Sequence, residues 1–352
     1  MILDPDKLNA ECACVSLDRG ALSRHLNTLT GDIGFAERLA ATHPTLLSNL
    51  PVFLKPDHIA RMAGIIREIE TVARLPAYQE AALSAAPAIA RFETGAIGVL
   101  MGYDFHLGAN GPRLIEINTN AGGALINAYL AEAQRACCQS PECRCPKPPP
   151  SRLEATKSAF VAMFRAEWSG LGKSRPLESI AIVDADPEGQ YLHPEFVLFQ
   201  RLFESHGLAA IIADPGSLTH RGEALFAGTQ RIDLVYNRST DFALALPASA
   251  ALAAAYAAGA AAVTPNPRTH ALHADKRNLA LLTDAAFLIG IGIDSECITT
   301  LQGGIAATRR VAKADERALW ANRDHLFFKP AAGFGSRAAY RGDKVTKRVF
   351  AD

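Results

Sequence analysis

The chain has 352 residues, of which 49% are hydrophobic and 20% are charged, so it is long enough to bury the cores of two or three domains. Lysine plus arginine equals aspartate plus glutamate at 36 each, and a nucleic-acid-binding surface normally shows as a basic excess. The N-terminal residues include acids and no apolar signal segment, and the Ala-rich stretch 243–262 is interrupted by Pro247. We therefore expect a cytoplasmic protein that binds neither nucleic acid nor a membrane.

The first region, residues 1–146, combines helices with two strands. Residues from about 35 to 90 are predicted to be helical, because apolar side chains recur there at spacings of three and four. Two strand-like runs follow, Gly98 to Leu107 and Arg113 to Asn118, and the polar turn Gly108 to Pro112 joins them. We therefore expect a helical part followed by a β-hairpin.

The predicted hairpin brings acidic side chains together. With a five-residue turn Leu107 pairs with Arg113, which places Asp104 opposite Glu116, and Asn118 shares the face of Glu116. Directly opposed like charges destabilise an antiparallel pair by roughly 0.2–1 kcal/mol, so folding alone does not favour this arrangement. Carboxylate and amide oxygens suit Mg²⁺, which completes its shell with water and substrate phosphates. These three side chains are candidate Mg²⁺ ligands; the alternative is a solvated hairpin face in a register shifted by one residue.

Four cysteines lie close together before a proline-rich stretch: Cys137, Cys138, Cys143 and Cys145. Without a secretory signal, they are expected to be reduced rather than to form disulfides. Their spacing lacks the paired C-x-x-C of common zinc sites, so a thiol-rich surface loop is the alternative to a metal site. The stiff run that follows predicts a linker and a helix over residues 147–177.

A small α/β domain is predicted over residues 178–270, because strands and helices alternate there. Such alternation implies crossover connections and a parallel sheet that is covered on both faces. No G-x-G-x-x-G follows the first strand, so a dinucleotide-binding dehydrogenase is not expected. The predicted strands are residues 179–184, 208–213, 231–236 and 261–264, and the predicted helices are residues 195–206 and 249–258.

The last region, residues 271–352, contains a glycine-rich turn between two predicted strands. A helix is expected from Asp275 to Ala286, an apolar strand from Leu326 to Lys329, and a returning strand from Lys344 to Phe350. Between the strands, the run from Gly333 to Ser336 lets backbone N–H groups approach phosphate oxygens, and the lysine at the strand end supplies a positive charge. A plain hairpin is the alternative explanation.

As a set, these motifs resemble the ATP-grasp superfamily. Their order is rotated, because the carboxylate strands precede the lysine and the glycine turn, so the chain resembles the circularly permuted group, which includes eukaryotic-type glutathione synthetases and glutathionylspermidine synthetases. The segment from Val235 to Phe242 is also similar to permuted members. The other motifs are Phe328-Lys329-Pro330 with Gly333-x-Gly335, the helix start Asp275-Lys276, and Asp104 with the run from Leu114 to Asn120.

The resemblance implies an α/β fold that is ATP-grasp-like and circularly permuted, with the small parallel-sheet domain attached. It also implies roles for individual residues. It assigns Mg²⁺ to Asp104, Glu116 and Asn118, ATP contacts to Lys276 and Lys329, and closure over the β- and γ-phosphates to Gly333, Gly335 and Ser336. Arg238 and Arg337 are candidates for binding an anionic substrate, and solvated or structural arginines are the alternative.

The activity that the resemblance implies is an ATP- and Mg²⁺-dependent ligase. A carboxylate of a small molecule or peptide attacks the γ-phosphate to give an acylphosphate, and an amine or thiol then displaces phosphate. Such a reaction depends on positioning and electrostatic stabilisation, which Mg²⁺ and the lysines supply. The alternatives are a nucleotide-binding protein without turnover, and a metal- or redox-responsive interaction protein that uses the cluster Cys137 to Cys145.

The C-terminal part is expected to be incomplete. In the family, more sheet and the segment that holds adenine follow the glycine hairpin, whereas this chain ends at Asp352. A two-stranded hairpin without support is marginal in water. We therefore expect residues 331–352 to be loosely docked and ATP turnover by this chain to be poor.

Overall fold

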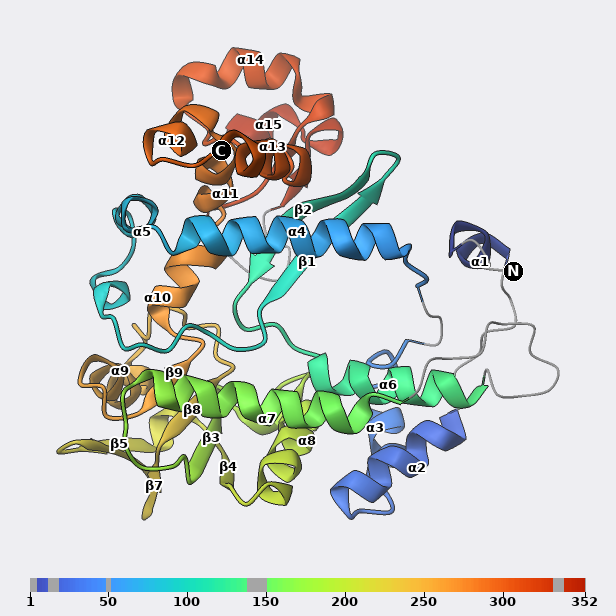
Figure 1. Ribbon diagram of the computed structural model, residues 1–352, viewed down its shortest axis with the longest axis vertical. Helices are drawn as coiled ribbons and strands as arrows, with labels where there is room; N and C mark the ends of the chain where they lie inside the picture. Colours follow the sequence, from blue (N-terminus) through green and yellow to red (C-terminus); the bar gives the residue numbers. More distant parts are fainter. Residues whose placement is uncertain (1–4, 12–18, 49–51, 138–150, 332–338, 352) are drawn as a thin grey trace. The chain divides into compact units, whose positions relative to one another are not determined.

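The computed structural model describes the chain except for residues 1–4, 12–18, 49–51, 138–150, 332–338 and 352 (Figure 1). The chain divides into two compact units, and each unit is assembled from three chain segments. Unit 1 comprises residues 1–59, 88–102 and 119–269, and unit 2 comprises residues 60–87, 103–118 and 270–352. None of the described helices is both long and apolar enough to cross a membrane.

Unit 1 contains a four-stranded parallel sheet in the order β4-β3-β8-β9, so the predicted parallel sheet is confirmed. Alternate residues of β3 enter different hydrophobic clusters, with Ile180 and Ile182 in one and Ala181 and Val183 in the other. Both faces of the sheet are therefore buried, as expected for strands joined by crossovers. The strands are β3 (Ser179–Val183), β4 (Ala209–Ala213), β8 (Leu234–Asn237) and β9 (Ala262–Thr264).

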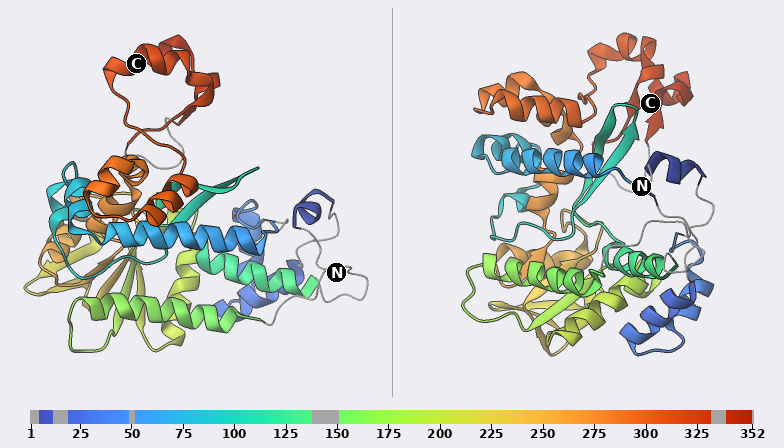
Figure 2. Two further views of the ribbon diagram at one scale, coloured as in Figure 1. Left: turned by 45° about the horizontal axis from the view of Figure 1, so that its top comes forward. Right: turned by 45° about the vertical axis from the view of Figure 1, so that its right-hand side comes forward.

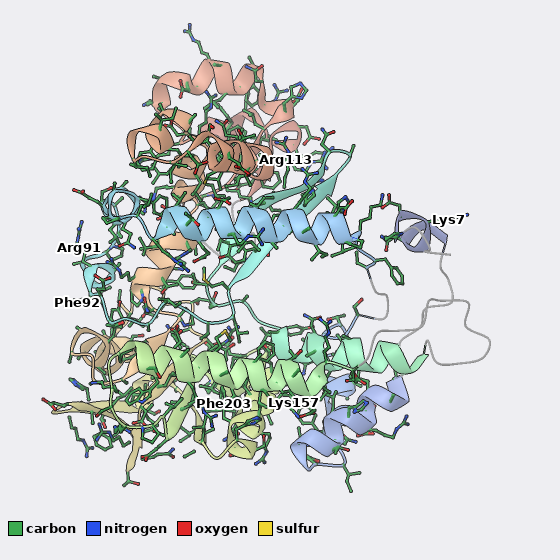
Figure 3. The ribbon with its side chains drawn as sticks, in the orientation of Figure 1. Lys7, Arg91, Phe92, Arg113, Lys157 and Phe203 are labelled. Carbon is green, nitrogen blue, oxygen red and sulfur yellow. The ribbon has the colours of Figure 1, made fainter. Side chains whose placement is uncertain are left out.

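Aromatic side chains fill the core on one face of this sheet. Phe164 of α7 and Phe199 of α8 lie with their ring centroids 5.0 and 5.3 Å from that of Tyr236 on β8. Phe203 lies on the same helix as Phe199 (Figure 3), and its ring centroid is 4.9 Å from that of Phe164. The helices whose residues enter this core are α2 (Arg19–Thr30), α3 (Phe35–Thr42), α6 (Ala124–Cys137), α7 (Leu153–Gly170) and α8 (His193–Ser205).

The other face is covered by α9 (Ala250–Ala257) and by an antiparallel sheet that the sequence did not predict. The single strand expected over residues 231–236 is wrong, because the chain changes sheet at Asp233. The buried carboxylate of Asp233 accepts hydrogen bonds from Arg175 and from the backbone N–H of Glu178, at 2.8 and 3.0 Å. The antiparallel strands are β5 (Leu218–Arg221), β6 (Ala224–Ala227) and β7 (Gln230–Ile232).

Unit 2 combines helices with two short hairpins (Figure 2). The helix predicted from Asp275 to Ala286 is interrupted, because the Asp284 side chain accepts the backbone N–H groups of Ala286 and Phe287 and starts a second helix. The helices are α4 (Pro56–Ala73), α5 (Pro76–Leu83), α11 (Arg277–Thr283), α12 (Ala285–Gly290), α13 (Ser295–Gly304) and α14 (Glu316–Ala321).

The first hairpin of unit 2 differs from the prediction at its start and at its turn. Strand β1 (Gly102–Gly108) begins later than expected, because the backbone N–H of Gly98 donates to the Glu167 side chain at 3.0 Å. Strand β2 (Gly111–Asn118) follows after two residues, so the five-residue turn is wrong. Gly111 has a φ of +94°, a conformation that glycine adopts without steric cost and that allows this tight turn.

The predicted returning strand from Lys344 to Phe350 is also wrong. Strand β10 (Phe327–Phe328) pairs antiparallel with β11 (Tyr340–Arg341), and residues 347–351 form the helix α15 (Lys347–Ala351). In this helix the Phe350 ring packs inward, with its centroid 5.2 Å from Trp320 and 5.7 Å from Phe328. Packing of this aromatic side chain therefore overrides the β propensity of the run.

Candidate functional site

Glu116 is the centre of a charged cluster in unit 2. Its Oε1 lies 3.1 Å from Nζ of Lys276, and its Oε2 lies 3.4 Å from Nζ of Lys329. Lys329 also donates to the carbonyl oxygen of Ile115 at 3.1 Å, and the backbone N–H of Lys276 donates to the carbonyl of Ala331 at 3.3 Å. Strand β2, the start of α11 and the end of β10 each supply one charged member. Three distant chain segments therefore converge on one carboxylate.

Asp104 and Asn118 lie beside this centre. The Asn118 amide donates to Asp104 Oδ2 at 3.3 Å. Burial raises the pKa of Asp104 and the negative charge of Glu116 raises it further, while Lys329 and Asn118 act in the opposite direction. The structure thus brings together all five described residues that the resemblance assigns to metal and ATP.

The charges of the cluster are partly shielded from water. The side chains of Lys276, Lys329 and Glu116 are 14%, 25% and 24% exposed. Ionic interactions at such half-buried positions are screened by salt less than those on an open surface. The cluster therefore has two positively charged lysines, which could bind a polyanion, and three oxygen-bearing side chains, which could bind a cation. Both interactions would be stronger here than on an open surface.

Four other predicted residues lie outside the described residues: Gly333, Gly335, Ser336 and Arg337. Cys138, Cys143 and Cys145 lie there too, and the described side chains do not include that of Cys137. Within the described part of the chain, no group of three or more His, Cys, Asp or Glu side chains is suited to a metal ion. The set Asp104, Glu116 and Asn118 is of another kind, with two carboxylates and one amide.

Arg238 belongs to unit 1 and is buried at the carboxyl end of β8. Its Nη1 donates to the carbonyl of Ala121 at 2.9 Å and to Tyr236 Oη at 3.3 Å, and its Nε has no hydrogen-bond partner among the described residues. Strand β3 has β4 on one side and β8 on the other, so the strand order reverses there. In open α/β sheets, ligands bind outside the carboxyl ends of the strands at such a point.

Glu195 is a buried residue near Arg238 that sequence reasoning missed. It accepts the backbone N–H groups of Gly123 and Leu125, at 2.6 and 3.0 Å, and so fixes the turn that begins α6. A Cβ on Gly122 would lie 2.2 Å from Leu192 Cδ1 and 2.9 Å from Arg238 Nη2, so a larger residue there would displace these two side chains. The adjacent glycines Gly122 and Gly123 indicated a turn in the sequence. Nothing in the sequence indicated that Glu195, an acid within a helix, would bind it.

Glu70 is a second missed residue, and it lies in unit 2. Its Oε1 accepts a hydrogen bond from Tyr103 Oη at 2.6 Å and lies 3.3 Å from Nε2 of His273. No local motif marks these residues, because they come from three separate chain segments.

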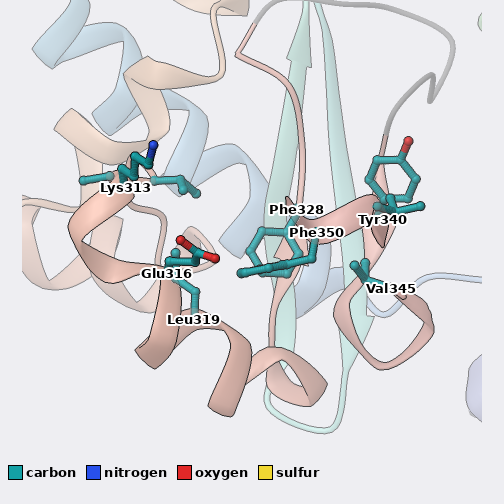
Figure 4. A pocket seen from close by; sticks show the side chains of 10 residues that line it. Lys313, Glu316, Leu319, Phe328, Tyr340, Val345 and Phe350 are labelled. Carbon is teal, nitrogen blue, oxygen red and sulfur yellow. The ribbon is translucent and has the colours of Figure 1, made fainter. Parts of the chain in front are cut away.

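An apolar pocket of about 480 Å³ lies elsewhere in unit 2 (Figure 4). Phe328 of β10 lines it, whereas the next residue, Lys329, reaches Glu116. Successive side chains of an extended chain point to opposite faces. The pocket and the charged cluster are therefore separate features. The other lining residues are Val311, Ala312, Lys313, Glu316, Leu319, Tyr340, Val345, Val349 and Phe350.

Comparison with known proteins shows a likeness to solved structures. No family model matches the chain, and no curated protein matches it. Among solved structures, the chain is similar to a glutathione synthetase-like effector from Globodera pallida in its apo form. The TM-score is 0.51 and the identity 12%, over 82% of this chain and 71% of the effector chain. At this identity the likeness concerns the fold alone, which is a mixed α/β fold of the glutathione synthetase-like kind.

Proposed function

We propose that the protein is an ATP- and Mg²⁺-dependent ligase that joins the carboxylate of a small molecule or peptide to an amine or thiol. The observation that carries the proposal is the convergence of Lys276 and Lys329 on Glu116, with Asp104 and Asn118 beside it. The likeness in fold to a glutathione synthetase-like effector supports it. The permuted ATP-grasp arrangement is part of the same proposal.

The side chains of the cluster fit a Mg²⁺–nucleotide. The carboxylates of Asp104 and Glu116 and the amide oxygen of Asn118 are hard donors of the type that Mg²⁺ prefers. Burial and the charge of Glu116 raise the pKa of Asp104, and a cation between the two carboxylates would offset that repulsion. Lys276 and Lys329 would then pair with phosphate oxygens. When bound, Mg²⁺ supplies charge neutralisation to the β- and γ-phosphates.

The proposed reaction proceeds in two steps. A carboxylate oxygen of the acid substrate attacks the γ-phosphorus, the bond to ADP breaks, and an acylphosphate forms. The amine or thiol then attacks the acyl carbon, inorganic phosphate leaves, and the proton of the nucleophile passes to solvent. In this proposal the two lysines hold the phosphates in line, and Gly333, Gly335 and Ser336 cover them. Arg337 is the candidate for binding the anionic substrate beside them, and Arg238 is a separate candidate for anion binding within unit 1.

An ADP-release screen of the full-length gene product against amino acids and small amines, with Mg²⁺ and with EDTA, tests this function. We expect ADP release that requires Mg²⁺, an acid and a nucleophile together. ATP binding by calorimetry without ADP release under any combination would favour the alternative of a nucleotide-binding protein without turnover. Absence of ATP binding would contradict the proposal.

A further inference from the structure

Glu70 joins the three chain segments that make up unit 2. It lies in the segment 60–87, Tyr103 is the first residue of the second segment, and His273 lies in the first turn of the third. One carboxylate oxygen of Glu70 accepts from Tyr103 at 2.6 Å and lies 3.3 Å from His273 Nε2. A single side chain of α4 therefore binds the start of one segment that carries the proposed nucleotide site and contacts the start of the other.

Both partners of Glu70 are close in sequence to residues of that site. Tyr103 directly precedes Asp104 in β1, and alternation across the strand points the two side chains to opposite faces. His273 lies three residues before Lys276, whose ammonium group is 3.1 Å from Glu116. A displacement of Tyr103 or His273 would therefore move Asp104 or Lys276.

The contacts of Glu70 are partly buried. The side chains of His273 and Glu70 are 9% and 33% exposed. Burial alone would raise the pKa of Glu70, but its contacts with His273 and Tyr103 bring the pKa below its usual value. Burial, reinforced by Glu70, raises the pKa of Tyr103, so the phenol keeps the proton that it donates.

Other contacts hold the same segments without Glu70. The buried Tyr78 donates to the carbonyl of Leu272 at 3.0 Å, and the Asn278 amide donates to the carbonyl of Ala271 at 2.7 Å. Strand β1 is paired with β2 in a two-stranded sheet. A Glu70 variant is therefore expected to fold, with a local change at Tyr103 and His273.

We propose that Glu70 is a positioning residue, which sets the separation of Asp104 and Lys276 through Tyr103 and His273. The inference rests on the proposed function, because the separation matters for a Mg²⁺–nucleotide held by these two residues. Glu70 acts through its neighbours, so its removal should weaken binding without removing a ligand.

Calorimetry of Mn²⁺–ATP binding to Glu70→Ala, Glu70→Gln and the control Glu80→Ala tests the proposal. Glu80 is an exposed acid on α5 of the same unit. We expect Glu70→Ala to weaken binding about tenfold, which corresponds to about 1.4 kcal/mol. Glu70→Gln should recover most of the affinity, because its amide oxygen still accepts from Tyr103, and Glu80→Ala should bind as the parent protein does. Unchanged affinity in Glu70→Ala would overturn the proposal.

A double-mutant cycle with Asp104→Asn separates positioning from general stability. If Glu70 acts through Asp104 and Lys276, the effect of Glu70→Ala on affinity should be smaller in the Asp104→Asn background than in the parent. Additive losses in affinity would show a merely structural role and would overturn the proposal.

Hydrogen exchange without ligand distinguishes a failure of this inference from a failure of the proposed function. In Glu70→Ala, amides of β1 and of residues 271–276 should exchange faster than in the parent, while those of β3 should not change. Faster exchange confined to these segments supports the positioning role even if no nucleotide binds. Unchanged exchange in both segments would overturn it even if the parent protein is an active ligase.

Discussion

Glu116 touches both lysines of the site, so its charge is central to the proposed chemistry. Glu116→Gln should lower Mg²⁺-dependent ATP turnover by about a hundredfold or more, because it removes a proposed metal ligand and leaves two positive charges unbalanced. The melting temperature should change little, since partly exposed ion pairs contribute about 0–1 kcal/mol. ADP release and thermal unfolding measure the two effects.

A matched control for this substitution is Glu204→Gln, which removes an acid paired with Arg201 at 2.9 Å on α8 of unit 1. It should leave turnover unchanged. Turnover retained by a folded Glu116→Gln protein would contradict the metal assignment.

Lys276 and Lys329 are predicted to contact ATP phosphates from separate elements. If each supplies a charge-assisted hydrogen bond worth about 1.5–3 kcal/mol, replacement by methionine should weaken ATP binding about ten- to a hundredfold. Calorimetry of Lys276→Met and Lys329→Met measures this. Lys157→Met is the control, since Lys157 lies on α7 (Figure 3) and pairs with Glu154. Equal affinity in all three variants would refute the assignment.

At the scale of elements, Asp233 separates two strands that belong to different sheets. Its carboxylate is 1% exposed and binds the Arg175 guanidinium through both oxygens. Asp233→Asn should lower the free energy of unfolding by about 2 kcal/mol, because it weakens charge-assisted bonds to a partner that is one-third exposed. Urea unfolding measures the loss. A change below about 0.5 kcal/mol would show that the carboxylate does not stabilise the passage of the chain from one sheet to the other.

The Asp233 carboxylate should also make the free energy of unfolding decrease at acidic pH. Burial would raise the pKa of Asp233, but the hydrogen bonds from Arg175 and Glu178 hold the pKa below its ordinary value of 3.8. The folded chain therefore binds this proton less readily than the unfolded chain, so the stabilisation is present above pH 3.8 and is lost as the pH falls through the lower folded-state pKa. The difference in unfolding free energy between the parent and Asp233→Asn should accordingly shrink in that acidic range.

Helix α15 depends on one aromatic anchor. Phe350→Ala removes the ring contacts with Trp320 and Phe328, and we expect a local loss of about 2 kcal/mol, below the 3–5 kcal/mol of a fully buried aromatic. Hydrogen exchange of amides 347–351 should accelerate, whereas the exposed neighbour Arg348→Ala should have no such effect. Equal exchange in the two variants would show that other contacts hold the helix.

The sequence was informative where local pattern decides the structure. The apolar runs of β3, β4 and β9 predicted buried parallel strands, because both faces of such strands need apolar residues. Local pattern failed at Asp233 and at Phe350, where a buried hydrogen-bonded carboxylate and an aromatic contact override propensity.

Five residues of the candidate site were named from short motifs, and the structure brings them together. Glu70 and Glu195 were not named from the sequence, because an acid within an amphipathic helix is indistinguishable by pattern from a solvated surface charge. The partners of Glu70 are 33 and 203 residues away in the chain, and those of Glu195 are 70 to 72 residues away. Such partners are visible only once the chain is folded.

At the scale of the whole molecule, all five described metal- and ATP-assigned residues lie in unit 2, whereas Arg238 lies in unit 1. A ligand that binds only the native state stabilises it by about 2.7 kcal/mol at a hundred times its Kd. Mg²⁺–ATP should therefore slow hydrogen exchange in β2 and α11 more than in β3. Slower exchange in β3 and β8 with no change in unit 2 would place the nucleotide in unit 1 and contradict the assignment.

The interleaving of the two units sets the order in which the site is completed. Glu116 and Lys329 are 213 residues apart, and most of the chain between them builds unit 1. At a synthesis rate of about 5–20 residues per second, the acidic hairpin is made roughly 10–40 s before the second lysine. During that interval a nascent chain carries every carboxylate of the cluster without its full complement of cations. The proposed nucleotide site can therefore be completed only after most of unit 1 has been synthesised.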